Sequence, residues 1–505
     1  GSVFPPDIAP ATFLWRDASA AASWRIEVAF ASGAPISVST AGPPARLGAI
    51  DRDCISTTNR LPEADPAQRS WRPSAALWET IKRRSMEGPA RVTVTGFAAG
   101  RVASRGSVRI ETSRDPVGAP IFYRDVPLMP TETQKGVIKP LAPYAIRLVD
   151  WRVRDISKDE SRVVMGGVPV CANCHSFSRD GTTLGMDLDG LRGNRGRYFL
   201  ANLKPETVVG ANDVLQWSTA EGRLESQIRV GFMSQVSPKG DYVVTTIDQP
   251  GAAASNYYVS NFTDYRFLQV FFPTRGRLAW YSKATGVLTP LAGADDPAWV
   301  NFGAMWSPDG ESLVFARARA QDPNPPGRPP ARFANDPNEL QIQYDLYRIP
   351  FNQGRGGVAR PIAGASANGY SNTFPKISPD GKWLVYVRSR NGQLIRPYSE
   401  LYIAPAEGGV ARRMRCNTPR MNSWHSFSPN GRWMVFSSKA RSYYTQMYLT
   451  HIDGEGVDTP PILIENSTPA NRAVNLPEFV NIEPDRLRSI GGPAIDYYRL
   501  YDRAL

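Results

Sequence analysis

Histidine and cysteine are scarce in this sequence of 505 residues, which contains three histidines and four cysteines. No stretch approaches about 18 uninterrupted apolar residues, so no transmembrane segment is expected. The absence of a glycine-rich phosphate loop, a nucleophile elbow and a His/Glu zinc motif argues against hydrolase chemistry. The net charge of +12 comes from dispersed arginines rather than a basic run. Nucleic acid is therefore not an expected partner, and charge would at most steer an acidic protein toward the surface.

Glycine and proline, by contrast, are abundant, with 42 and 44 residues that separate short apolar runs. This pattern is typical of strands joined by tight turns and predicts an all-β protein. From Cys174 onward a short unit recurs that ends in Ser-Pro-Asp-Gly or a close variant and leads into an alternating apolar strand. Its copies lie at 175–181, 234–240, 304–310, 375–381 and 425–431.

These repeats have the form of propeller blades, since four strands in each unit of about 50 to 70 residues must close into a ring to bury their faces. Five blades can be counted directly. For a sixth, we expect 475–482 to supply the inner strand and 146–153 and 163–165 the outer ones, which would clasp the ring shut. The repeats resemble the TolB-type six-bladed propeller family from about residue 140 to the end of the chain.

The region before the repeats has a different texture. Alternating runs at 24–30, 92–97 and 108–112 predict half-buried strands, and Ser74 is a possible cap for a short helix over 74–82. We expect an immunoglobulin-like β-sandwich at 1–115, a linker at 116–142 and the propeller at 143–505.

One motif carries chemistry, the run Cys171-Ala-Asn-Cys174-His175. Its spacing allows two thiols to add to the vinyl groups of haem while the histidine supplies the proximal iron ligand. A redox dithiol would need a βαβ setting that is absent, and zinc would need more ligands than the isolated Cys54 and Cys416 offer. The sequence therefore predicts one covalent haem c. A single such motif opening the first TolB-like blade resembles uncharacterised bacterial haem-propeller proteins.

The repeat register also suggests distal iron ligands. It places His425 at the position equivalent to His175, so we expect both imidazoles to face a common space near one end of the axis. The alternative is a histidine hydrogen-bonded within its turn. Met233, one residue before the equivalent position in the second repeat, and Met186, after the first inner strand, are rivals, and methionine would raise the reduction potential.

Two weaker features remain open. The run Asp187-Leu-Asp189-Gly190 could begin a calcium loop, but it lacks the later ligands, so a polar turn is the preferred interpretation. Cys54 and Cys416 either form a disulfide in an oxidising compartment or remain two buried thiols.

Resemblance to c-type cytochromes implies thioether attachment outside the cytoplasm, and hence a periplasmic or cell-surface location. Gly1-Ser2 is typical of a cleaved tag, so any signal segment would have been removed. The leading hypothesis is electron transfer to a redox partner protein. The alternatives are a haem-dependent oxidoreductase, peroxidase-like or a dehydrogenase, with the channel as substrate site, and a protein- or glycan-binding propeller with a structural haem.

Overall fold

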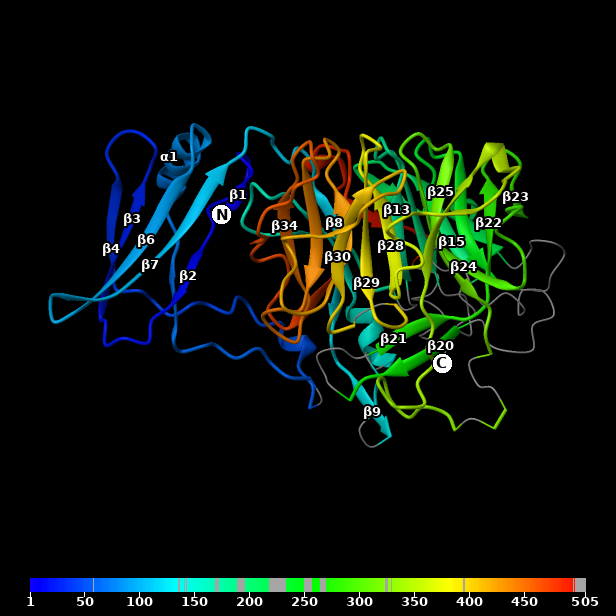
Figure 1. Cartoon of the computed structure of the whole chain (residues 1–505), viewed down its shortest axis with the longest axis horizontal. Coiled ribbons are helices and arrows are strands. Elements are labelled where there is room, and N and C mark those ends of the chain that lie inside the picture. Colours follow the sequence, from blue (N-terminus) through cyan, green and yellow to red (C-terminus); the bar gives the residue numbers. More distant parts are fainter. Residues whose placement is uncertain are drawn as a thin grey trace.

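The computed structural model describes residues 1–57, 59–134, 137–139, 141, 143–168, 172–188, 196–217, 233–248, 257–263, 269–322, 326–327, 329–393, 396–493 and 495. These residues form a small N-terminal domain beside a larger ring of β-sheets (Figure 1). No helix among them is long and apolar enough to cross a membrane.

The N-terminal domain is built on a five-stranded sheet with the strand order β1–β7–β6–β3–β4. Its strands are β1 (Ser2–Phe4), β3 (Ser23–Ala29), β4 (Ile36–Thr40), β6 (Ala90–Ala98) and β7 (Arg101–Thr112). A helix, α1 (Ala75–Met86), and a ribbon of β2 (Phe13–Arg16) and β5 (Gln68–Trp71) share one core with this sheet. An immunoglobulin-like sandwich would have a second sheet packed on this one. In the structure α1 and the β2–β5 ribbon take the place of that second sheet, so the predicted sandwich is wrong in this layer. The predicted cap is confirmed, because the Ser74 hydroxyl accepts a hydrogen bond from the Leu77 amide.

The ring consists of six four-stranded sheets, which are the blades of the propeller. The strands of each blade are given below in the order in which they are hydrogen-bonded to one another. Blade one contains β13 (Ala172–Phe177), β14 (Thr183–Leu188), β15 (Arg197–Asn202) and β17 (Val214–Gln216), and blade two contains β18 (Gln235–Val236), β19 (Tyr242–Ile247), β22 (Arg277–Ser282) and β23 (Val287–Pro290). Blade three contains β24 (Trp299–Trp306), β25 (Ser312–Arg319), β26 (Asp345–Pro350) and β27 (Arg360–Pro361). Blade four contains β28 (Ser371–Ile377), β29 (Trp383–Ser389), β30 (Glu400–Pro405) and β31 (Arg412–Arg413). Blade five contains β32 (Asn422–Phe427), β33 (Trp433–Ser438), β34 (Gln446–His451) and β35 (Ile462–Leu463). Blade six contains β36 (Arg472–Phe479), β8 (Ile121–Pro127), β11 (Asp150–Arg154) and β12 (Arg162–Gly166).

The first strands of the six blades contact one another in cyclic order, β13, β18, β24, β28, β32, β36 and back to β13. They are therefore the innermost strands, and the predicted six-bladed propeller is confirmed. Smaller elements decorate the ring. They are the pairs β9 (Thr131–Gln134) with β10 (Val137–Lys139), β20 (Tyr257–Asn261) with β21 (Gln269–Pro273) and β16 (Glu206–Val208) with β37 (Ser489–Gly491), and the 3-10 turns η1 (Arg52–Cys54), η2 (Pro143–Leu148), η3 (Ala211–Asp213), η5 (Asn352–Gly354) and η6 (Pro484–Arg486). Of these, β9, β20 and β21 lie at one end of the ring (Figure 1).

Blade six joins distant parts of the chain, as the sequence predicted, because β36 lies beside β8 and β8 beside β11. One boundary differs. Residues 121–127 fall in the stretch assigned to a linker, yet they form β8, a strand of the propeller. All seven residues of β8 are buried, including Arg124 and Asp125. A central strand that is covered on both faces does not alternate between apolar and polar residues. Because β8 also contains charged residues, its sequence resembles that of a polar connection, and the strand was not predicted.

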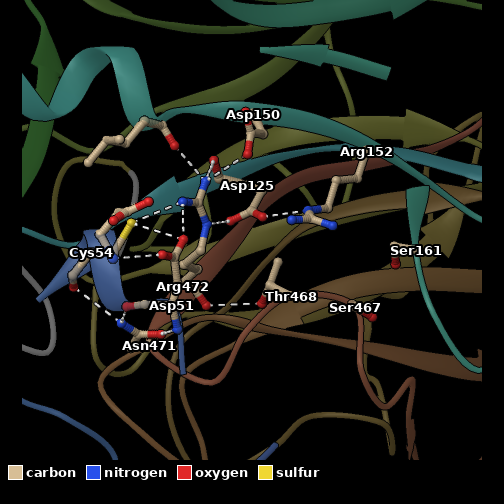
Figure 2. A network of polar contacts seen from close by, with 12 residues as sticks. Asp51, Cys54, Asp125, Asp150, Arg152, Ser161, Ser467, Thr468, Asn471 and Arg472 are labelled. Atoms are coloured by element: carbon tan, nitrogen blue, oxygen red, sulfur yellow. Dashed lines mark hydrogen bonds and ion pairs between the residues drawn. The ribbon is translucent and has the colours of Figure 1, made fainter. Parts of the chain in front are cut away.

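A polar network ties this closing blade to the N-terminal domain (Figure 2). Arg472, the first residue of β36, donates from Nε to Asp125 Oδ1 in β8 at 2.6 Å. Its Nη1 donates to Asp51 Oδ2 at 2.8 Å and to Cys54 Sγ at 3.0 Å, in and beside η1. The guanidinium therefore links the two ends of the ring and the preceding domain at a single buried point.

Candidate functional site

One residue with a left-handed backbone conformation occupies the same repeat position in every blade. It lies within the innermost strand, except in blade two, where it precedes β18. These residues are Cys174 (φ 31°), Met233 (φ 57°), Gly303 (φ 62°), Phe374 (φ 53°), Trp424 (φ 49°) and Leu476 (φ 53°). The pairing register shifts there in β13, β24, β28, β32 and β36, which marks a β-bulge. Bulges re-aim side chains and are frequent beside functional sites. Cys174 of the predicted haem motif thus lies on a bulge that recurs in five of the six blades.

His175 follows the bulge residue of blade one and lies in a dry setting. Its side chain is 1% exposed, and its ring packs edge-on against Phe122 of β8, with centroids 4.7 Å apart. Neither ring nitrogen makes a hydrogen bond of standard geometry in the described part of the chain, although the Leu476 backbone lies near enough to act on the ring as an acceptor. Burial lowers the pKa of His175 to about 3, and the charge of Lys376 acts in the same direction while the Leu476 backbone opposes it. The imidazole is therefore neutral, the form that binds metal ions.

A carboxylate and an ammonium stand beside this imidazole. Glu478 Oε2 of β36 lies 3.9 Å from His175 Nε2, and Lys376 Nζ of β28 lies 3.4 Å from Glu478 Oε1. Because β28 and β36 are the inner strands of blades four and six, the Lys376–Glu478 pair joins two blades that blade five separates. Burial raises the pKa of Glu478, and Lys376 opposes that effect. His175 thus lies beside a charged pair that two other blades contribute.

The predicted common space for the two histidines is not what the structure shows. His425 follows the bulge residue of blade five, as its register implied, but its Nε2–H donates to the Val385 carbonyl of β29 at 3.0 Å. Burial lowers the pKa of His425 to about 3. The imidazole is therefore held between blades four and five, whereas His175 lies between blades six and one. Equivalent residues of a ring face equivalent interfaces, which here are two blades apart.

The two methionine candidates also have other neighbours. Met186 is fully buried in β14, directly opposite His175 in the strand pairing. Directly paired side chains extend from the same face of a sheet, so Met186 lies on the same side of its sheet as His175 and does not face it from across the site. Met233 extends toward blade three, where a Cβ on Gly303 would lie 3.6 Å from its sulfur. Neither residue is arranged as a ligand opposite His175.

The remaining predicted residues have the following places. Cys174 is partly exposed, whereas Cys171, Asp189 and Gly190 lie outside the described residues. The Asp187 carboxylate accepts hydrogen bonds from the amide and hydroxyl of Ser234 in blade two. Among the residues that the structure describes, no group of three or more His, Cys, Asp or Glu could hold a metal ion.

The second pair of cysteines is not joined. Cys54 and Cys416 are buried thiols in different hydrophobic clusters and form no disulfide. Burial raises the pKa of Cys54 to about 12, although the nearby Arg472 charge opposes this shift. Burial raises the pKa of Cys416 as well. Thiols with raised pKa values are poor nucleophiles and poor metal ligands, so neither cysteine is arranged for such chemistry.

Three features of the described residues bear on whether a haem fits beside His175. An axial ligand requires a neutral imidazole with a ring nitrogen that is not committed to a hydrogen bond of standard geometry, and His175 meets this condition. A thioether requires a reachable thiol, and Cys174 is partly exposed one residue away. The bulge residues of blades four to six, Phe374, Trp424 and Leu476, are apolar and pack with one hydrophobic cluster, as suits a porphyrin. The residues present therefore fit the group.

Comparison with known proteins adds context to this geometry. No family model matches the chain. An uncharacterized protein of Agrobacterium fabrum is 27% identical over 169 residues, or 30% of this chain and 55% of that protein, so the match spans about half the length of the relative. TolB of Acinetobacter baumannii has a TM-score of 0.42 at 11% identity, covering 78% of this chain and 79% of TolB.

Two further solved structures are similar. A putative TolB of Agrobacterium tumefaciens gives a TM-score of 0.37 at 14% identity, covering 72% of this chain and 98% of its own. Hydrazine synthase of Kuenenia stuttgartiensis gives 0.39 at 12%, covering 74% of this chain and 48% of that one. The class of the protein rests on its own strand pairings, which define a closed six-bladed β-propeller joined to a small, mostly β domain.

Proposed function

We propose that this chain is an extracytoplasmic c-type haem protein that transfers electrons, with one haem c held by Cys171, Cys174 and His175 at the propeller channel. The observation that carries the proposal is His175, which is buried while neither of its ring nitrogens makes a hydrogen bond of standard geometry in the described structure. Leaving a buried polar group unsatisfied costs about 1–3 kcal/mol, and binding to iron would offset that cost at one nitrogen.

The parts of the chain would divide the work as follows. When bound, the haem supplies a one-electron iron couple. His175 would hold the iron, Cys171 and Cys174 would hold the porphyrin, and Phe122 and Phe177 keep water from the imidazole. The electron would pass to a redox partner protein, and the overall positive charge of the chain suits an acidic one. Thioether attachment outside the cytoplasm supports a periplasmic or cell-surface location.

A second candidate is a haem-dependent oxidoreductase that uses an open sixth position on the iron. It is favoured by the positions of the three predicted distal ligands. His425 donates to a backbone carbonyl, Met186 lies on the same side of its sheet as His175, and Met233 extends toward Gly303. A substrate or peroxide entering the channel would then meet the iron directly.

One preparation tests both candidates. The protein should be produced with haem-attachment machinery, its mass should be measured after denaturation, and its visible spectrum should be recorded oxidised, reduced and with carbon monoxide. Electron transfer predicts covalent haem and a low-spin reduced form that ignores carbon monoxide. The oxidoreductase predicts covalent haem and a high-spin form that binds carbon monoxide. A mass without haem would overturn both.

A further inference from the structure

The sheet of the N-terminal domain ends in a strand with an open edge. Its strand order is β1–β7–β6–β3–β4, so β1 and β4 are the two edge strands. The β1 edge is covered, because β1 also contacts β34 and β35 of blade five. In the described structure β4 pairs with β3 alone, and Figure 1 shows β4 at the end of the domain that lies away from the ring. The backbone groups along the outer side of β4 can therefore accept a further strand.

The sequence of β4 does nothing to prevent such pairing. Proteins usually protect an exposed edge with charged residues, with proline or by keeping the strand very short. The outer strands of the blades follow this rule, with Pro290 in β23, Arg360 and Pro361 in β27, Arg412 and Arg413 in β31, Arg162 in β12, and three residues in β17. By contrast, the five residues of β4, Ile36-Ser-Val-Ser-Thr40, contain neither a charge nor a proline.

The two faces of β4 differ in chemistry. Its apolar side chains pack against the core of the domain. Ser37 and Ser39 are exposed on the opposite face, because successive side chains of a strand alternate between its faces. Their partners in β3 are Glu27 and Arg25, respectively. One acidic and one basic residue therefore flank this edge, each behind a small serine.

We propose that β4 pairs antiparallel with β4 of a second copy of this chain, with Val38 on the two-fold axis, so that the two five-stranded sheets become continuous. In this register Ser39 lies beside the second copy's Ser37, which places Arg25 and the second copy's Glu27 in one cross-strand row. Their Cα atoms are three strand spacings apart, or about 14 Å. Both side chains are long and the serines between them are small, so the opposite charges can approach each other. Symmetry repeats this row once.

Charge complementarity favours this occupant and this register. A shift of two residues would align Arg25 with the second copy's Arg25, or Glu27 with its Glu27, and like charges would then repel each other. A shift of one residue would place the apolar side chains of one strand on the polar face of the other. The pairing also stops at two chains, because the β1 edge of each sheet is already covered. Nothing in it requires a haem.

Sedimentation equilibrium of the full chain, whose monomer mass is 55.6 kDa, measures the dimer over a range of concentrations. The wild type should dimerise. Arg25→Glu and Glu27→Arg should each weaken the dimer by about tenfold, because both rows then hold like charges. An equimolar mixture of the two variants should restore it, since both rows of the mixed dimer again hold opposite charges. Arg91→Glu, an exposed charge reversal in β6 on the same face of the sheet, is the control and should leave the dimer unchanged.

Three results would overturn the inference. A wild type that stays monomeric at every concentration means that a second copy does not occupy this edge. A dimer that is equally tight in Arg25→Glu, Glu27→Arg and Arg91→Glu has its interface elsewhere. Hydrogen exchange of the wild type needs no variant, and the amides of Ile36–Thr40 should exchange more slowly at concentrations where the dimer forms. Equal exchange rates for the monomer and the dimer would exclude pairing through β4.

Discussion

Arg472 and Asp125 form a buried ion pair, with the arginine Nε 2.6 Å from the aspartate Oδ1 and side-chain exposures of 3% and 0%. Arg152 contacts the other carboxylate oxygen, and Arg472 reaches on to Asp51 and Cys54 in the N-terminal domain. The pair therefore holds together the first and last strands of the ring, and its removal should destabilise the whole fold.

Arg472→Ala is expected to lower the free energy of unfolding by ~3–5 kcal/mol, because it leaves the buried Asp125 without its partner. Chemical denaturation of the variant and the wild type would measure the difference. The control is Arg413→Ala, which removes an ion pair with Glu400 whose side chains are 50% and 35% exposed. Exposed pairs contribute about 0–1 kcal/mol, so a similar loss in both variants would contradict the structural role assigned to Arg472.

Cys174→Ala should abolish most of the covalently attached haem, because it removes the reachable thiol of the attachment motif. The readout is the mass of the denatured protein, or haem staining after denaturing electrophoresis. Cys416→Ala is the matched control, since that thiol is buried in a separate cluster of blades four and five. Equal haem content in the two variants would be incompatible with attachment at Cys174.

His425→Ala should leave the visible spectrum of the haem protein unchanged, because Nε2 of this residue is engaged by the Val385 carbonyl. The substitution should still lower the free energy of unfolding by ~1–3 kcal/mol, since it leaves a buried carbonyl without its donor. Absorption spectra of the oxidised and reduced forms decide the matter. A change of spin state would restore His425 as the distal ligand that the repeat register first suggested.

Stability should fall with acid, in part through His425. Its pKa is lowered by burial to about 3, below the ordinary value of 6.5, so the unfolded chain binds the proton more readily. The contribution is complete above about pH 6.5 and is lost as the pH falls from there toward about 3, at no more than ~1.4 kcal/mol per pH unit. Burial lowers the pKa of His451 also, which adds a loss of the same sign.

The comparison is the free energy of unfolding at several pH values for wild type and His425→Gln, whose amide keeps a donor but does not titrate. The variant should show a shallower decline below about pH 6.5. Parallel curves for the two proteins would mean that His425 is not the source of the acid sensitivity assigned to it.

Much of the fold could be predicted from the sequence because the blades repeat a local signal. The Ser-Pro-Asp-Gly turn and the alternating strand after it recur in five copies, which located the innermost strands of five blades. The C-terminal strand that closes the ring lacks this turn and was inferred because the blades must close into a ring. β8 escaped because Arg124 and Asp125 are buried there by partners that are distant in sequence, such as Arg472. No local sequence pattern indicates a strand whose charged side chains are paired with residues far away in the sequence.

The site was predicted less completely, for a geometric reason. The register placed His175 and His425 correctly in their blades, but register does not tell which blade interface a side chain enters after a bulge. The same register, moved by one residue, aligns Lys376 and Glu478 with Ser176 and Ser426. Two charges of opposite sign at a repeated position were a signal of an ion pair between two inner strands, although only the closed ring shows that they meet beside His175.

The mixed origin of blade six also has a consequence for the order in which the molecule is assembled. Asp125 and Arg472 are 347 positions apart, so β8 must wait for nearly the whole chain before β36 can pair with it. Phe122 precedes His175 along the chain, but Glu478 arrives only with that last strand. During synthesis the surroundings of His175 thus stay open on one side until five blades exist, and the imidazole is enclosed in the final step of folding.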